Sequence, residues 1–275
     1  MTWADIGYVA GMTTIVLVMA LVLGYGTLRL HQFRPRPAPA PGPQRWSYGD
    51  IAHVVAFYFG VMVLAQFCAF TLTAQRLPAH AVELSALVST TFANVCVCLY
   101  IIVLGEFRRG KTLGALGLSR RDGAWNLGLG LYLYVCFCPL VLASMQLVEI
   151  VSESFGHGLP AQPLVRLVMT EQTRSVMAAA VALVVVVAPL TEEVIFRGFL
   201  FSALRDNVGR WPAIVLSAAL FAAAHTSMAA FLPVFLLGLL LAWAFDHTET
   251  LVASMAIHLT HNTASVLWIL FMRLE

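Results

Sequence analysis

Apolar residues gather in eight long segments, and most charged residues lie in the stretches between them. Most of these segments are close to the roughly 20 residues that a helix needs to cross the hydrocarbon core of a bilayer. The pattern therefore predicts an all-α, polytopic membrane protein with about eight transmembrane helices. The predicted spans are residues 6–28, 50–74, 83–105, 126–149, 175–204, 211–227, 229–246 and 250–272.

The composition agrees with this interpretation and excludes some classes of function. Hydrophobic residues make up 60% of the chain and charged residues 11%, whereas a soluble domain has roughly 25% charged residues. The net charge of +2 at pH 7 is too small to indicate a nucleic-acid-binding protein. The five cysteines lie in apolar stretches without zinc-site spacing, so we interpret them as small core residues.

A proline-rich, basic stretch, RPRPAPAPGPQR at residues 34–45, separates the first two apolar segments. Such a sequence favours an extended, semi-rigid linker. The predicted organisation has four parts along the chain. They are an N-terminal transmembrane helix (1–30), a Pro/Arg-rich cytoplasmic linker (31–49), membrane helices two to four with their loops (50–174) and a C-terminal helical core (175–275).

The distribution of lysine and arginine predicts the orientation of the spans. Twelve of the sixteen Lys and Arg residues fall on one side of the membrane if eight spans alternate in direction. Because basic loops stay in the cytoplasm, both termini are predicted to lie outside it. Lys111 is the single lysine, and this preference for arginine, with abundant alanine, is typical of a GC-rich bacterial genome. We therefore expect a multi-pass protein of a bacterial inner membrane.

Three ionisable residues follow one of the most apolar runs of the chain, AAAVALVVVVAPL at residues 178–190. They are Glu192, Glu193 and Arg197, and ionisable groups at membrane depth cost about 2.5–3.5 kcal/mol each. Glu193 and Arg197 are four residues apart with the acid first, which favours an ion pair along a helix. Glu192 is left without a partner in its own helix, which suits a group that accepts and returns a proton. The alternative interpretation is an ion-pair network that only locks helices together.

Two later segments also contain polar residues. His225 ends the stretch FAAAH, where a lone histidine is more often a packing residue than a catalyst. His258 and Asn262 lie four residues apart in the stretch HLTHN and therefore share one helix face. His261 lies close to that face and stays a candidate by its spacing.

The depths of these residues in the membrane agree with one another. Counted inward from the cytoplasmic ends at about 1.5 Å per residue, Glu192, His225, His258 and Asn262 lie roughly 12–21 Å deep. Three helices are therefore expected to direct these groups into one cavity. Polar groups that converge at such a depth are expected to surround water and a polar substrate.

Three motifs occur in a fixed order along the C-terminal half. They are E-E-x-x-x-R from Glu192 to Arg197, F-x-x-x-H from Phe221 to His225, and H-x-x-x-N from His258 to Asn262. In this order, over about residues 175–270, the chain resembles the CAAX protease and bacteriocin-processing (CPBP, or Abi) family of intramembrane endopeptidases. The resemblance implies an all-helical membrane protease with its catalytic residues in the C-terminal half.

The resemblance also implies roles for the residues in these motifs. Glu192, assisted by His225, would activate a water molecule for attack on a peptide bond. His258 and Asn262 would stabilise the oxyanion, an effect worth about 3–4 kcal/mol per donor in other hydrolases. The substrate would be a membrane-anchored or lipidated protein or peptide within the lipid bilayer. Two further residues would shape the site: Glu193 and Arg197.

The sequence allows two interpretations of the site, one without a metal and one with zinc. The resemblance fits a site without a cofactor or metal, and the zinc motif H-E-x-x-H is absent from the sequence. Glu192, His225 and His258 would nevertheless supply the three protein ligands that a catalytic zinc needs.

Other functions use similar residues. Buried Glu and His residues also serve as ion relays in transporters, although no repeated halves are visible in this chain. A non-catalytic immunity or assembly factor on the same scaffold is a third hypothesis.

Overall fold

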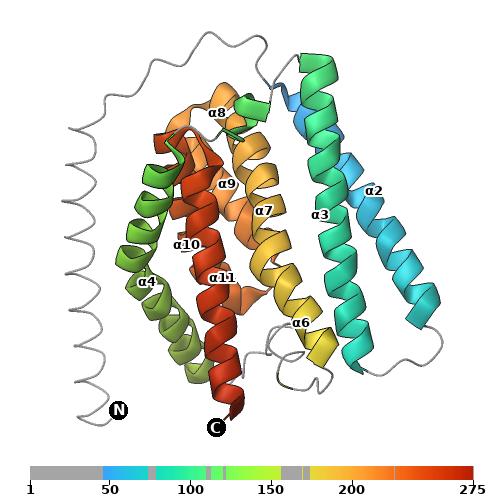
Figure 1. The fold of residues 1–275 in the computed structure, drawn as a ribbon, viewed down its shortest axis with the longest axis vertical. Coiled ribbons are helices and arrows are strands. Elements are labelled where there is room, and N and C mark those ends of the chain that lie inside the picture. Colours follow the sequence, from blue (N-terminus) through green and yellow to red (C-terminus); the bar gives the residue numbers. More distant parts are fainter. Residues whose placement is uncertain are drawn as a thin grey trace.

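The computed structural model describes residues 46–73, 79–109, 113–119, 122–155, 169, 174–225 and 227–274. All regular secondary structure in these ranges is helical, as predicted (Figure 1). The predicted first span and most of the proline-rich linker lie outside the described residues.

The helices follow the predicted apolar segments closely. Two segments within the long helix that starts at Arg174 are π-helical, and one short segment after α3 is a 3-10 helix. In chain order the helical elements are α2 (Tyr48–Thr73), α3 (Ala79–Arg109), η1 (Leu113–Leu116), α4 (Gly123–Ser154), α6 (Arg174–Ala182), η2 (Leu183–Val187), α7 (Ala188–Glu193), η3 (Val194–Phe201), α8 (Ser202–Val208), α9 (Arg210–Ala224), α10 (Met228–Thr248) and α11 (Leu251–Leu274).

Six helices in the described part of the chain are long and apolar enough to cross a membrane. The protein is therefore an integral membrane protein. Helix α9 is apolar but has 15 residues, about 22 Å of helix against a hydrocarbon core of about 30 Å. The prediction of many membrane-spanning helices is confirmed, whereas the count of about eight stays a prediction.

The described helices alternate in direction (Figure 1). The segment after α3, the turn between α8 and α9, and the turn between α10 and α11 all lie at the same end of the molecule. This is the alternation on which the predicted orientation depends. Which end faces the cytoplasm stays a prediction from the arginine distribution.

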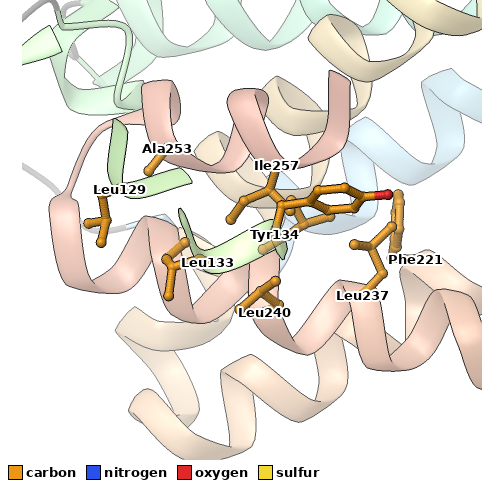
Figure 2. Close-up of a cluster of buried hydrophobic side chains, with 10 residues drawn as sticks. Leu129, Leu133, Tyr134, Phe221, Leu237, Leu240, Ala253 and Ile257 are labelled. Carbon is orange, nitrogen blue, oxygen red and sulfur yellow. The ribbon is translucent and has the colours of Figure 1, made fainter. Parts of the chain in front are cut away.

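Four helices of the bundle share one hydrophobic cluster. Side chains from α4, α9, α10 and α11 meet there, and Tyr134 extends across Ile257 toward Phe221 (Figure 2). Burial of such side chains fixes the position of α11, which also contains His258. The buried members are Leu129, Leu133, Tyr134, Phe221, Leu237, Leu240, Leu241, Ala244, Ala253 and Ile257.

Helices α4 and α11 approach closely because small residues lie at their contact. A Cβ atom on Gly130 of α4 would lie 2.5 Å from the carbonyl oxygen of Ala253 and 2.8 Å from the Cβ atom of Ala256. Small residues at such crossings let membrane helices pack backbone to backbone. Ala256 lies two residues before His258, so this contact limits where the His258 side chain can be.

The segment before α2 is attached to α8. Trp46 is buried, its ring packs edge-on against Phe199 with centroids 4.9 Å apart, and its backbone N–H donates to Asp206 at 3.3 Å. Asn207 Nδ2 donates back to the Trp46 carbonyl at 3.0 Å. Helix α2 therefore starts from a fixed point on the C-terminal half.

The η1 segment joins two helices of the C-terminal half. A Cβ atom on Gly198 would lie 2.8 Å from the Leu116 carbonyl oxygen, so the glycine allows this close contact. Gly117, with φ of +77°, accepts a hydrogen bond from the Leu251 N–H at 2.9 Å. This contact satisfies one of the free N–H groups at the start of α11.

We predict that Gly130→Ala destabilises the protein, because the added methyl group has no room between α4 and α11. Overpacking of this kind costs about 1–3 kcal/mol, and the midpoint of thermal unfolding in detergent should fall accordingly. Gly128→Ala is the matched control, since nothing lies within 4 Å of its new Cβ atom. Equal midpoints for the two variants would contradict the close crossing.

Candidate active site

Both glutamates lie in a helix whose backbone departs from regular α geometry on either side of them. The helix from α6 to α8 is continuous, but the π-helical segments η2 and η3 flank α7, which ends in Glu192 and Glu193. π-Helical segments are rare in proteins overall, and those that occur are often found at functional sites. Pro189, at the start of α7, has no N–H to donate to the preceding turn. The interruption therefore lies about one turn from the carboxylates.

Glu193 is fully buried, and two side chains contact one of its oxygens. Arg197 Nη1 donates to Glu193 Oε1 at 2.9 Å, which confirms the ion pair predicted from their spacing. His258 Nδ1 lies 2.8 Å from the same oxygen and arrives from α11. Because a carboxylate accepts, Nδ1 is assigned the hydrogen in this contact.

His258 lies between the two glutamates. While Nδ1 contacts Glu193, the other ring nitrogen, Nε2, lies 3.7 Å from Glu192 Oε2. The His258 side chain is 3% exposed and that of Glu192 is 17% exposed. Glu192 is therefore the more accessible carboxylate of the two, and His258 connects it to the buried one.

Phe221 is buried and contacts Arg197, His225 and His258, although the sequence indicated it only as part of a motif. The Arg197 guanidinium carbon lies 4.2 Å from its ring centroid, which is a cation–π contact. The ring centroids of His225 and His258 lie 4.8 and 5.6 Å from that of Phe221. This side chain thus brings α9 into contact with residues of both η3 and α11.

His225 lies at the exposed edge of this group of site residues. It follows the last residue of α9, its side chain is exposed, and its Nδ1 lies 2.8 Å from the Phe221 carbonyl oxygen. A carbonyl only accepts, so Nδ1 bears the hydrogen and Nε2 keeps its lone pair. Among the described residues, His225 makes no hydrogen bond or ion pair with Glu192.

Asn262 faces the same neighbouring helix as His258, as their spacing predicts. Its Nδ2 donates to the Val184 carbonyl oxygen in η2 at 2.9 Å. His261, by contrast, packs edge-on against Tyr134 of α4, with ring centroids 5.9 Å apart. The structure therefore separates the contacts of His261 from those of the glutamates.

One residue that contacts the glutamate segment was missed by sequence reasoning. Cys98 of α3 is buried, and its thiol donates to the carbonyl oxygen of Thr191, directly before Glu192, at 3.2 Å. The contact fixes α3 against α7. A cysteine inside an apolar segment gives no sequence signal for such a contact.

The three residues that the sequence offered as zinc ligands do not form a metal-binding group in the described part of the structure. Among the described residues, no three His, Cys, Asp or Glu side chains form a group that could hold a metal ion. Glu192, His225 and His258 are therefore not arranged as three ligands of one metal.

Fold and site together define a class of protein: a polytopic helical membrane protein with a cluster of two glutamates, an arginine and a histidine, of which Glu192 alone is partly accessible. Residues 174–264 match the family described as Type II CAAX prenyl endopeptidase Rce1-like, a protease family. The match confirms the resemblance to CAAX proteases, and all six candidate site residues lie within it. Neither a curated protein nor a solved structure matches the chain.

We predict that Arg197→Lys lowers stability, because lysine loses the planar contact with the Phe221 ring while it has to reach the buried Glu193 carboxylate. A weakened buried charge contact costs about 1–3 kcal/mol, measured as the midpoint of thermal unfolding in detergent. Arg273→Lys, near the end of α11, is the matched control and should change the midpoint little. A similar small change for both variants would mean that the guanidinium group is not required.

Proposed function

We propose that this protein is an intramembrane endopeptidase that hydrolyses a peptide bond of a membrane-anchored substrate. The observation that supports this most directly is the position of His258 between two glutamates of different exposure. Glu193 is held by two partners, whereas Glu192 is partly accessible and lies near a single imidazole nitrogen. Such an arrangement leaves Glu192 available to react.

The charges of the cluster favour one mobile proton. Glu192 and Glu193 contribute two negative charges and Arg197 one positive charge, in a site where uncompensated charge is costly. The cluster is neutral when one further proton resides on either Glu192 or His258. Nε2 of His258 and Oε2 of Glu192 are 3.7 Å apart, so a small movement lets the pair share that proton.

The proposed reaction starts from the form in which His258 holds this proton. Glu192 takes a proton from water while the water oxygen adds to the carbonyl carbon of the substrate. The Nε2–H of His258 is directed toward the same region and stabilises the negative oxygen of the intermediate. The C–N bond then breaks, and Glu192 gives its proton to the leaving amine. The products are an amine and a carboxylic acid, which then loses its proton to solvent, and both glutamates return to their starting state.

The other residues of the motifs act around this pair. Glu193 orients His258 through Nδ1, in the way that a carboxylate orients the imidazole in other hydrolases. Arg197 balances the charge of Glu193 and packs on Phe221. His225 lies at the exposed edge of the cluster, where its free Nε2 can contact the attacking water once substrate is bound.

The proposed substrate is a protein or peptide held in the membrane by a lipid or a transmembrane segment. The matched family is described by its action on CAAX prenyl proteins, and a substrate of this kind reaches the site from the bilayer. From its arginine-rich composition we place the protein in a bacterial inner membrane, with the basic loops in the cytoplasm.

We predict that Glu192→Gln abolishes proteolysis and leaves the protein folded, since glutamine keeps the shape of the side chain but cannot accept the proton of water. A general base contributes roughly 10²–10⁴-fold to the rate. Membrane proteomes of cells that produce the wild type or the variant identify substrate fragments, and an internally quenched farnesylated CAAX peptide in proteoliposomes gives the rate.

Glu153→Gln, on an exposed position of α4, is the matched control and should behave like the wild type. Activity of Glu192→Gln above about a tenth of the wild type would overturn the assignment. Identical proteomes for the wild type and Glu192→Gln would favour an ion relay or a non-catalytic scaffold instead.

We further propose that the reaction needs no metal ion, since Glu192 with His258 provides both the base and the oxyanion donor. Activity should then survive prolonged treatment with EDTA or 1,10-phenanthroline. A zinc enzyme should lose activity on chelation and regain it with added Zn²⁺, because the metal supplies the acidified water. Close to one zinc per purified chain, lost in His258→Ala, would replace this proposal with a metalloprotease.

A further inference from the structure

The backbone carbonyl of Val184 lacks the donor that it would have in a regular helix. In an α-helix it would accept from the N–H of Ala188, four residues ahead. The structure instead shows the Ala188 N–H donating to Leu183, five residues back, in the π-helical pattern of η2. In that pattern the donor for Val184 would be residue 189, which is Pro189 and has no N–H.

A polar backbone group without a partner is costly in a membrane protein, because the bilayer core offers no water to replace the missing donor. Here the missing donor is a side chain. Asn262 Nδ2, from α11, donates to the Val184 carbonyl oxygen at 2.9 Å. The amide therefore supplies the hydrogen bond that Pro189 removes.

This hydrogen bond is one of the side-chain contacts by which α11 holds the glutamate-bearing helix. His258 contacts Glu193 at the end of α7, and Asn262, one turn further along α11, contacts Val184 in η2. Pro189 and Glu192 lie between these two contacts. The backbone segment whose register sets the direction of the Glu192 side chain is therefore fixed at both ends.

We propose that Asn262 is a positioning residue that caps the Val184 carbonyl and thereby holds Glu192 in its reactive direction. The family resemblance implies an oxyanion contact for Asn262 instead, which its second Nδ2 hydrogen is available to make, and the experiment below distinguishes the two roles. The inference rests on the proposed function for the reactive role of Glu192. The hydrogen bond itself is independent of that function.

The test is a rescue by a second substitution. In Asn262→Ala the Val184 carbonyl loses its donor, and displacement of the glutamate segment should lower kcat by roughly tenfold to hundredfold with little change in KM. In Asn262→Ala/Pro189→Ala, residue 189 regains an N–H five residues ahead of Val184. If the turn relaxes to α geometry, Ala188 becomes the donor, so either register restores the bond.

The double variant should therefore recover most of the kcat and of the thermal-unfolding midpoint that Asn262→Ala loses. Pro189→Ala alone should behave like the wild type, because Asn262 still caps the carbonyl. Thr263→Ala is a control for the neighbouring position, since its hydroxyl is exposed and donates within α11 to Leu259. Rates are measured with the farnesylated CAAX peptide and with substrate fragments found in the membrane proteome.

Two results would overturn the proposal. If the double variant stays as slow as Asn262→Ala, the amide contacts the substrate directly, because a change at Pro189 cannot replace an oxyanion donor. If Asn262→Ala lowers only the unfolding midpoint and leaves kcat unchanged, the hydrogen bond is structural and positions nothing. Glu192→Gln with full activity would overturn the proposed function alone, while the unfolding midpoints of the single and double variants still test the bond to Val184.

Discussion

Burial of the Glu193 carboxylate is the constraint on which the arrangement of the site depends. An unpaired charge in this position would cost several kcal/mol, so the side chain needs partners from more than its own helix. Arg197 supplies one from η3, and His258 supplies the other from α11. The second contact requires α11 to lie beside α7, which the shared hydrophobic cluster and the close crossing at Gly130 allow (Figure 2). His258 is thereby also placed 3.7 Å from Glu192.

The irregular helix that contains the glutamates shows how a membrane protein keeps such a backbone. Each departure from α geometry leaves polar groups that water cannot satisfy at this depth. Side-chain hydroxyls add donors to the carbonyls along it: the Thr191 hydroxyl donates to the Val187 and Ala188 carbonyls at 2.9 and 3.0 Å, and the Ser202 hydroxyl to the Arg197 carbonyl at 3.3 Å. Asn262 supplies a donor to the Val184 carbonyl from a neighbouring helix.

Elements outside the region matched to the protease family also hold the site. Cys98 of α3 contacts the carbonyl directly before Glu192, and the η1 segment packs on Gly198, directly after Arg197. Trp46 anchors the start of α2 on α8. The N-terminal half thus contributes support for the helix that contains the glutamates, and the match over residues 174–264 covers only part of what positions them.

The sequence by itself determined the features that depend on local spacing and composition. The apolar segments predicted the helices, the four-residue spacing predicted the pair of Glu193 with Arg197, and the spacing of His258 and Asn262 predicted that both face one neighbour. Tertiary structure decided the rest, because each remaining contact joins residues far apart in the chain. In the structure His258 lies between the two glutamates, and Phe221 contacts three charged or polar side chains. Asn262 donates to the Val184 carbonyl, and His225 lies at the exposed edge of the site. The structure also contains π-helical segments on both sides of α7, which the sequence analysis did not predict.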